Sequence, residues 1–520
     1  MAHIPSTNHE LALFSLVPIN DSAKGVLGYF GNRRLLSLLR DPENPVRVRQ
    51  ALNVGFNVDS KTKTRGTLAT IGRAGDIIIP DDRISRIQCS FEINVQSQEV
   101  MLYDRSTLHT TSVRGPDAHD FSPGLPRKVL VAPGLNTEIW LGEEYSFALH
   151  WHKHALDIGA ELELFQEDLL QRRTIEAASP ARDTVSHHAL PDLKPNIRFQ
   201  RRKALGSGSF GKVYKAANID TGDLFAVKLV YIPDRARKPR NYAQVMREVE
   251  TLARSSHPNI VDYLFAQRND NYLEICMGLY QGSVEALVAR NLFEGDVDLT
   301  LNLLHQMLMA LDYLAVNGIV HRDIKPANIL FTVHPSSCDH TFVLSDFGLC
   351  NFVAEAVTYA GTPLFMAPEL SRDPQNGQTP KMDIWSLAIT IAYAANLAGF
   401  RKKQPQNEKD VIEAVQRATN EPNFRGLRPM VILAPTQRAS AAYMLDVLFE
   451  GKGRAVQQDA EASASRARSK AKPPSQPARF PTLGAPKRHP ASRARPKRDA
   501  KRPVSSGDDG TAARRPRLGY

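Results

Sequence analysis

The chain has 520 residues, of which 42% are apolar and 23% are charged. This composition is typical of globular proteins and excludes collagen-like, membrane-embedded and fully disordered classes; at roughly 100–200 residues per domain, the length predicts two to four domains. The four cysteines lie far apart, which excludes a disulfide framework and a cysteine-rich zinc site and favours a reducing intracellular compartment. The N-terminus lacks the basic flank and long apolar run of a secretory signal.

The net charge of +11 is unevenly distributed. Residues 451–520 contain 18 Lys and Arg and 5 Asp and Glu, a net charge of +13, whereas residues 1–450 contain 48 basic and 50 acidic side chains, a net charge of −2. The last segment is also rich in Pro, Ala and Ser, so it cannot bury enough apolar area to offset its chain entropy. The sequence therefore predicts a nearly neutral globular protein that ends in a disordered basic tail.

Short strand-like runs dominate residues 1–155. They are rich in β-branched and aromatic side chains and are separated by Gly, Asp, Ser and Gln; they occupy residues 67–72, 76–80, 89–95 and 99–104. A first strand is expected at residues 11–19, followed by a partly helical insertion over 21–44. Regular spacing of short strands is typical of a β-sandwich, so residues 1–155 are predicted to form an all-β sandwich with an N-terminal extension.

Residues 156–196 are predicted to be a linker, and residues 197–450 a second folded unit. This unit begins with strand-like segments and continues with long helical ones, which indicates an α+β fold with two lobes. One segment, residues 384–400, has 17 residues without a charge. A membrane span needs about 20 such residues, so a buried core helix is expected here.

A glycine-rich segment opens the second unit: GSGSFGKV, residues 206–213, with the spacing GxGxxGxV. In a dinucleotide-binding fold such glycines lead into a helix, but here strand-like residues flank them on both sides. We therefore expect a hairpin over phosphates, in which Gly206, Gly208 and Gly211 let backbone N–H groups approach closely. Lys228 follows in the apolar strand AVKLV and is predicted to reach into a cleft, with Glu248 as its acidic partner.

The most specific motif is HRDIKPANIL, residues 321–330, which is followed by DFG at 346–348 and APE at 367–369. With the glycine-rich segment and the VK pair, this ordered set is far more specific than any of its parts. Residues 197–450 therefore resemble the eukaryotic protein kinase family. The resemblance implies a bilobal fold and transfer of a phosphoryl group from ATP, with Mg²⁺, to protein hydroxyls.

The resemblance also implies a role for each motif residue. Asp323 would be the catalytic base, and Lys325 would steady the transferred phosphate. Asn328 and Asp346 would hold Mg²⁺, while Lys228 would grip the α- and β-phosphates.

The resemblance places the adenine ring beside the segment CMGLYQGS. Cys276 is expected at the gatekeeper position, and Met277 and Leu279 would offer backbone groups to the adenine edge. The residues expected around the nucleotide are Leu205, Gly206, Gly208, Gly211, Val213, Ala226, Lys228, Met277, Leu279 and Leu330.

Two threonines bear on the choice of substrate hydroxyl and on activation of the kinase. Lys325 and Thr362, the latter in GTPLFMAPE, match members of the family that phosphorylate serine and threonine. Thr358 lies where activating phosphorylation commonly falls, and a phosphate there could pair with Arg322 and order the activation loop. An ordinary loop threonine is the alternative.

The N-terminal unit resembles a forkhead-associated (FHA) domain, a β-sandwich whose end loops bind phosphothreonine. Two cations and a hydroxyl at one loop edge suit a phosphate dianion. The positions that match the family are Gly72, Arg73, Ser85, Arg86, Asp104, Ser106 and Thr111, of which Arg73, Ser85, Arg86 and Thr111 are expected to bind the phosphopeptide. Gln88 stands where the family has a structural histidine, and His109–Thr110 replaces the usual Asn-Gly. These departures favour phosphate capture over peptide selectivity, and a degenerate sandwich retained for docking is the alternative.

The order of the two units resembles checkpoint-type serine/threonine kinases. This implies protein substrates, phosphothreonine-containing partners and a role in checkpoint or DNA-damage signalling. The basic clusters at 487–503 and 514–517 resemble nuclear import signals, so the nucleus is expected, and otherwise the cytoplasm. Nucleic acid remains open as a partner of the tail, and no membrane partner is expected. A phosphopeptide-binding scaffold with weak or no kinase activity and a nucleic-acid-associated protein are the rival functions.

Overall fold

The computed structural model describes residues 11–40, 48–58, 66–94, 96–152, 197–208, 211–231, 249, 253, 255–269, 272–334, 337–346, 363–372, 379–403, 405 and 407–455. Residues Met1–Val456 form one compact unit, and Gln457–Tyr520 form a second, which lies outside the described residues. The predicted linker, most of the predicted tail and three predicted site residues also fall outside them; these residues are Glu248, Thr358 and Thr362.

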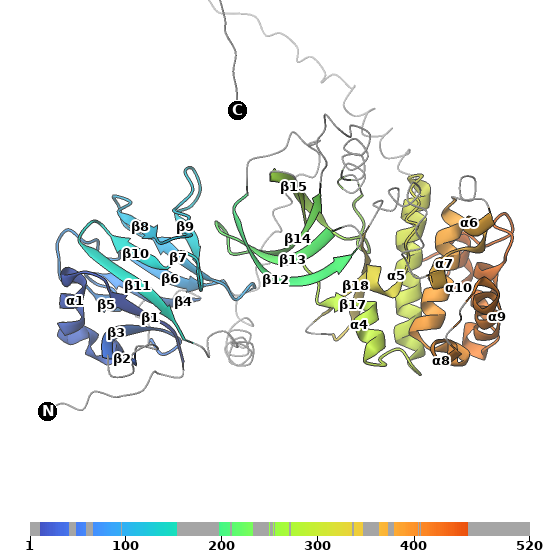
Figure 1. Cartoon of the computed structure of the whole chain (residues 1–520), viewed down its shortest axis with the longest axis horizontal. Helices are drawn as coiled ribbons and strands as arrows, with labels where there is room; N and C mark the ends of the chain where they lie inside the picture. The colour runs from blue at the N-terminus through green and yellow to red at the C-terminus, as the bar shows by residue number, and fades with distance from the viewer. Residues whose placement is uncertain are drawn as a thin grey trace, which may run out of the picture. The chain divides into compact units, whose positions relative to one another are not determined.

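Two β-sheets make up the N-terminal part, drawn in blue and cyan in Figure 1. Their strands are β1 (Ala12–Pro18), β2 (Leu36–Arg40), β3 (Val48–Gly55), β4 (Thr67–Gly72), β5 (Ile77–Ile78), β6 (Cys89–Ile93), β7 (Val100–Asp104), β8 (Thr111–Arg114), β9 (Lys128–Val131), β10 (Glu138–Leu141) and β11 (Tyr145–Trp151). One sheet has the order β2-β3-β1-β11-β10-β8 and the other β5-β4-β6-β7-β9. The predicted all-β sandwich is therefore present.

Aromatic side chains join the two sheets of the sandwich. Phe14 of β1 and Phe91 of β6 are fully buried, and their rings meet edge to face with centroids 4.9 Å apart. The predicted helical insertion is present as α1 (Asp21–Gly28) and η1 (Phe30–Leu35), but it ends earlier than expected. Residues 36–40 instead form β2, because Ser37 and Leu39 alternate inward along a strand that pairs with β3.

A five-stranded antiparallel sheet begins the second folded part. Its order is β12-β13-β14-β16-β15, and its strands are β12 (Phe199–Gly208), β13 (Gly211–Asn218), β14 (Leu224–Tyr231), β15 (Tyr263–Asn269) and β16 (Tyr272–Met277). A small sheet in the order β17-β18-β19 follows, made of β17 (Gly282–Ser283), β18 (Ile329–Val333) and β19 (His340–Leu344).

Helices form the rest of this part, in yellow to red in Figure 1. They are α4 (Val284–Ala289), α5 (Val297–Val316), η4 (Pro326–Asn328), η6 (Pro363–Phe365), α6 (Pro368–Arg372), α7 (Pro380–Ala394), η7 (Leu397–Gly399), α8 (Phe400–Lys403), α9 (Glu408–Ala418), η8 (Pro422–Val431) and α10 (Ala441–Phe449). Strands first and helices later give the predicted two-lobed α+β arrangement.

The apolar segment 384–400 lies in the core of the helical lobe. Most of α7 is buried on all sides, and it packs in one apolar cluster with α5 and α10. This confirms the prediction of a core helix. Among the described residues, α5 is the one helix whose length and composition would let it cross a membrane, and its Leu303, Leu304 and Met307 are fully buried in the same cluster.

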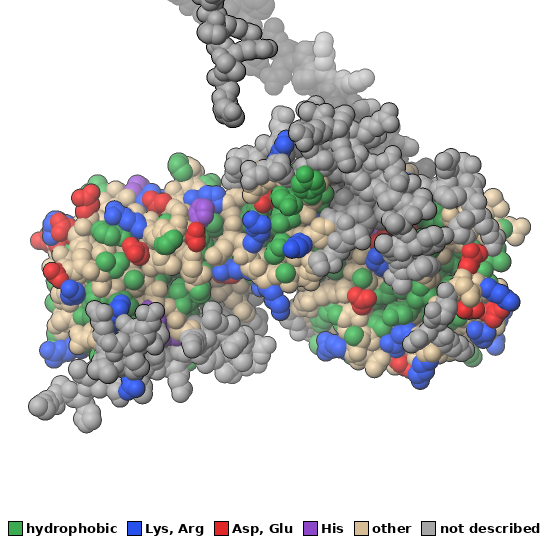
Figure 2. All heavy atoms as spheres, in the orientation of Figure 1, with side chains coloured by type: hydrophobic (Ala, Val, Ile, Leu, Met, Phe, Trp, Pro, Cys, Tyr) green, Lys and Arg blue, Asp and Glu red, His purple; other side chains and the backbone are tan. Residues whose placement is uncertain are grey.

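Charged side chains of both signs are interspersed on the described surface in Figure 2. This mixture agrees with the net charge of −2 over residues 1–450.

Candidate active site

The predicted catalytic residues meet in the loop between α5 and β18. The Lys325 Nζ lies 2.8 Å from Asp323 Oδ2. The Asn328 side-chain amide donates to the same carboxylate oxygen at 2.7 Å and to the Asp323 backbone carbonyl at 2.8 Å. These contacts hold one carboxylate beside a cation and an amide; Asp323 and Lys325 are partly exposed, whereas Asn328 is buried.

A buried aspartate of α7 anchors this loop. The backbone N–H groups of His321 and Arg322 each donate to one carboxylate oxygen of Asp383 at 2.8 Å. Burial raises the pKa of Asp383, and the charges and N–H groups of His321 and Arg322 oppose this effect. Arg322 holds a backbone φ of +74°, a conformation that costs a non-glycine residue free energy and persists where the surroundings impose it. The two hydrogen bonds to Asp383 provide that constraint.

Lys228 and Asp346 bring the sheet and the helical lobe together. Lys228, on β14, is 6% exposed, and its ammonium pairs with Asp346 Oδ1. The sequence prediction paired Lys228 with Glu248, which lies outside the described residues. In this structure the lysine expected at the phosphates and the aspartate expected at Mg²⁺ form an ion pair with each other.

The glycine-rich segment is a hairpin, as predicted. β12 and β13 pair with Gly206 opposite Val213 and Gly208 opposite Gly211. Gly211 has a φ of +135°, and a Cβ there would lie 2.0 Å from the Leu229 carbonyl oxygen. Only glycine fits this backbone approach, and the strand on each side distinguishes the segment from a dinucleotide-binding turn.

The remaining nucleotide residues line the same region. Ala226 is nearly buried, whereas Leu205 at the mouth is 49% exposed. Partial exposure to solvent is found for Val213, Met277, Leu279 and Leu330.

The strand register corrects the expected gatekeeper. Ala226 and Lys228 lie two residues apart on β14 and therefore share a face, and their partners on β16 are Met277 and Ile275. Cys276 pairs with Val227 on the opposite face and is fully buried in a different apolar cluster. The gatekeeper prediction for Cys276 is therefore wrong, because the alternation of β16 turns Met277 toward the face that carries Lys228.

A bidentate ion pair joins α6 to the segment before α10. Arg438 donates to both carboxylate oxygens of Glu369, at 2.6 and 2.9 Å, and its side chain is completely buried. It also donates to the Ile432 carbonyl at 2.8 Å and lies over the Trp385 ring. This pair fixes the APE segment next to the core helix α7.

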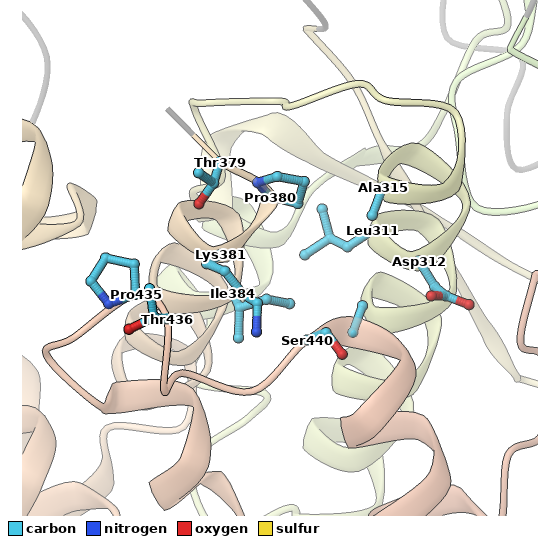
Figure 3. Close-up of a pocket in the computed structure, with 11 residues that line it drawn as sticks. Leu311, Asp312, Ala315, Thr379, Pro380, Lys381, Ile384, Pro435, Thr436 and Ser440 are labelled. Atoms are coloured by element: carbon cyan, nitrogen blue, oxygen red, sulfur yellow. The ribbon is translucent and has the colours of Figure 1, made fainter. Parts of the chain in front are cut away.

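A pocket of about 440 Å³ lies elsewhere in the helical lobe. In Figure 3, Leu311 projects from α5 toward Ile384 of α7, and Asp312 and Ala315 lie on the same helix. The predicted catalytic residues do not contribute to its lining, so this pocket is separate from the candidate active site.

The predicted phosphopeptide residues lie on two loops of the sandwich that are bonded together. The Arg73 N–H donates to the Ser85 carbonyl at 3.1 Å, and the Ala74 N–H donates to the Arg86 carbonyl at 2.8 Å. The Arg73 guanidinium holds the Ile84 carbonyl at 2.8 Å. Arg86 and part of Arg73 are exposed, so two cations are accessible at this edge.

Gln88 joins these loops to a third one. Its side-chain oxygen accepts from the Ser85 N–H at 3.0 Å, and its amide donates to the hydroxyls of Thr110 at 2.8 Å and Thr111 at 3.2 Å. Gln88 thus makes the loop connection at the position where a structural histidine was expected. Thr111 is 1% exposed, which contradicts its predicted contact with peptide, because its hydroxyl is used inside the sandwich. Thr110, which the sequence analysis named only as a departure from the family pattern, is an exposed residue at this edge.

A family model described as "Protein kinase domain" matches residues 199–445. Residues 199–445 are a protein kinase domain. This match agrees with the predicted enzyme class, and kinases of this family use ATP and Mg²⁺.

The relatives that match this domain include kinases of mitogen-activated cascades. "Mitogen-activated protein kinase kinase kinase 2" of Arabidopsis thaliana is 39% identical over 211 residues, which are 38% of this chain and 31% of the relative. "MAP kinase kinase kinase wis4" of Schizosaccharomyces pombe is 35% identical over 215 residues, 38% of this chain and 15% of the relative. The chain thus covers less than a third of the length of these relatives.

Among solved structures, the crystal structure of Rad53 1–466 in complex with AMP-PNP aligns with 74% of this chain and 92% of its own, at 22% identity and a TM-score of 0.49.

The described residues of the kinase domain suit Mg²⁺ with a nucleotide. Mg²⁺ is usually bound by one or two carboxylates together with phosphate oxygens and water, and Asp346 supplies a carboxylate. Asn328 donates twice through its amide nitrogen, which leaves its side-chain oxygen as the group suited to a cation. Within the described ranges, no cluster of three or more His, Cys, Asp or Glu could hold a metal by itself.

Proposed function

We propose that this chain is a serine/threonine protein kinase that transfers the γ-phosphate of ATP to protein hydroxyls. The observation that supports this most directly is the cluster of Asp323, Lys325 and Asn328, with the Lys228–Asp346 pair across the cleft. A base, a cation for the transferred group, a candidate metal ligand and a buried lysine are all present. Few proteins other than kinases need this set together.

Each residue of the site has one task in this proposal. The ATP–Mg²⁺ complex supplies the transferable phosphoryl group. Asp323 accepts the proton of the substrate hydroxyl and orients its oxygen. Asn328 keeps the base in place through one hydrogen bond to its carboxylate and one to its backbone carbonyl. Lys325, 2.8 Å from the base, supplies positive charge beside the attacking oxygen. With nucleotide bound, Lys228 would hold phosphate oxygens and Asp346 would hold the cation, in place of the Lys228–Asp346 pair.

The test is transfer of radiolabelled phosphate from ATP to a generic protein substrate by the purified full chain, followed by phosphoamino-acid analysis. Phosphoserine and phosphothreonine are expected. Phosphotyrosine would contradict the specificity, and no transfer with or without prior phosphorylation would favour the phosphopeptide-binding scaffold.

We further propose that the sandwich binds phosphothreonine in protein partners. Arg73 and Arg86 offer two accessible cations at one edge, and Gln88 fixes their loops to the one that carries Thr110. A dianionic phosphate gains most from charge-assisted hydrogen bonds to guanidinium groups. The expected partner is a protein with a phosphorylated threonine.

The combination of such a module with a kinase domain and a basic C-terminal segment also supports a proposal about the pathway. We infer a nuclear kinase of checkpoint or DNA-damage type, with activating phosphorylation at Thr358. A phosphatase-treated enzyme that keeps its full activity would contradict the regulatory part.

A further inference from the structure

The hairpin loop between β13 and β14, residues 219–223, does not behave as a surface loop. Loops between strands normally lie in solvent, yet Ile219 is 1% exposed. Together with Ala217, it belongs to the apolar cluster that also contains the core of the N-terminal sandwich. The kinase sheet and the sandwich therefore share buried apolar surface.

A backbone hydrogen bond joins the same loop to the edge of the sandwich. β9 is the last strand of its sheet, which leaves one side of the strand without a partner strand. The Leu130 N–H on β9 donates to the Ile219 carbonyl at 2.8 Å. Exposed strand edges promote unwanted pairing and are usually covered, and the kinase loop covers this one.

The tip of the loop lies close against β7. Gly222 has a φ of +80°, and a Cβ there would lie 2.7 Å from Met101 Sδ. The positive φ therefore favours glycine at this position, and a Cβ there would require the Met101 side chain to move. Met101 is 1% exposed, so the contact is part of the buried surface.

Polar groups surround the apolar contact. Arg198 pairs with Asp220 and donates to the Asp120 carbonyl at 2.7 Å. The Ser122 hydroxyl donates to Asp220 at 2.9 Å. These bonds connect the kinase part to the loop before β9.

A second ion pair lies on the strand that leads to the glycine-rich segment. Arg202 of β12 lies 2.9 Å from Glu99, and the two side chains are 22% and 18% exposed. Burial raises the pKa of Glu99, and the charges of Arg202 and Lys215 oppose this. A mostly buried carboxylate is destabilising unless a cation neutralises it, so Glu99 depends on Arg202.

We propose that the edge of β9 and the adjoining end of β7 form a docking surface for the β13–β14 loop of the same chain. The sandwich then supports the strands that carry Lys228 and flank the glycine-rich segment, in addition to any phosphopeptide that it binds. The two folded parts behave as one unit. This inference concerns a contact and does not depend on catalytic activity.

Hydrogen exchange of the full chain, followed by mass spectrometry of peptides that contain Leu130, tests the contact. Ile219→Asp places a charge in the shared apolar cluster, and we expect exchange at Leu130 to accelerate by about tenfold or more because its acceptor is withdrawn. Leu264→Asp, at an exposed position of β15 in the same lobe, should leave this exchange as in the wild type. Unchanged exchange in Ile219→Asp would overturn the proposal.

Swapping the charges of Glu99 and Arg202 separates loss of docking from general unfolding. Glu99→Arg and Arg202→Glu should each accelerate exchange at Leu130, and the double variant should return toward the wild-type rate, since only facing residues can rescue each other. Glu92→Arg, which breaks a pair with Arg105 inside the sandwich, is the matched control. Single variants without effect would contradict the proposal. Exchange that depends on protein concentration would also contradict it, because the loop would then come from a second copy.

Discussion

Asp323 accepts hydrogen bonds from both Lys325 and Asn328 through the same carboxylate oxygen. The other oxygen is therefore the one better placed to receive a proton from a substrate. A substitution that keeps the shape of this side chain but removes its basicity separates catalysis from folding and nucleotide binding.

Asp323→Asn should reduce kcat by about 10²–10⁴-fold, the usual contribution of a positioned general base. The measurement is phosphate transfer at saturating ATP, with nucleotide affinity determined separately and expected to change little. Asp298→Asn, at an exposed position in the first turn of α5, is the control. Transfer at the wild-type rate by Asp323→Asn would disprove the assignment of the base.

Arg73→Ala should weaken binding of a phosphothreonine peptide to the full chain. The loss of a hydrogen bond to a charged group costs about 1.5–3 kcal/mol, which is roughly a tenfold to hundredfold increase in Kd. Fluorescence anisotropy with phosphorylated and unphosphorylated peptides measures it, and Arg33→Ala, on η1, serves as the control. Equal affinity for the two peptides in the wild type would show that the sandwich does not read phosphate.

At the scale of residues, motif spacing predicted which side chains meet but not which side chains are buried. Asp323, Lys325 and Asn328 meet because a short loop contains all three. Thr111 and Cys276 were misplaced because the face of a strand that a residue occupies depends on its register, which a motif alone does not define.

Among the structural elements, α6 and the segment before α10 are held together by the buried charge pair of Glu369 and Arg438. Arg438 is completely buried and Glu369 is 10% exposed. The guanidinium also contacts backbone carbonyls, but these carry no full charge. The stability of this region therefore depends on the carboxylate.

Glu369→Ala should destabilise the kinase domain by about 3–5 kcal/mol, because it leaves a buried arginine without its counter-ion. Denaturant unfolding followed by circular dichroism measures the change. Glu413→Ala removes an exposed carboxylate on α9 that lies 3.7 Å from Arg417, and should cost about 0–1 kcal/mol. If the two variants were equally stable, the buried pair would not be a structural requirement.

Elements with a clear local signal were predictable. Strand-like residues on both sides of the glycines predicted the β12–β13 hairpin, and a run of 17 uncharged residues predicted the core helix α7. The strand β2 was not, since residues 36–40 read as part of a helical insertion and become a strand only by pairing with β3. Tertiary pairing of this kind overrides local propensity.

For the whole molecule, the structure moves the end of the kinase part beyond residue 450. The Ala455 N–H donates to Asp312 at 2.9 Å, and Arg454 pairs with Asp446 at 2.9 Å. The compact unit ends at Val456. Residues 457–520 hold 16 Lys and Arg and 5 Asp and Glu, a net charge of +11 that equals the charge of the whole chain.

Removal of residues 457–520 should therefore leave phosphate transfer unchanged and reduce accumulation in the nucleus. A truncation at residue 450 would be a poorer test, because it would also remove the contacts of Arg454 and Ala455 with the helical lobe. A matched variant keeps the full length and replaces the Lys and Arg of 457–520 with Gln, so that charge is separated from length. Both variants should lose nuclear accumulation and any salt-dependent affinity for DNA, since that affinity scales with the number of phosphates neutralised. Unchanged localisation in both would exclude the tail as the import signal, and DNA affinity retained in both would place a nucleic-acid site within residues 1–456.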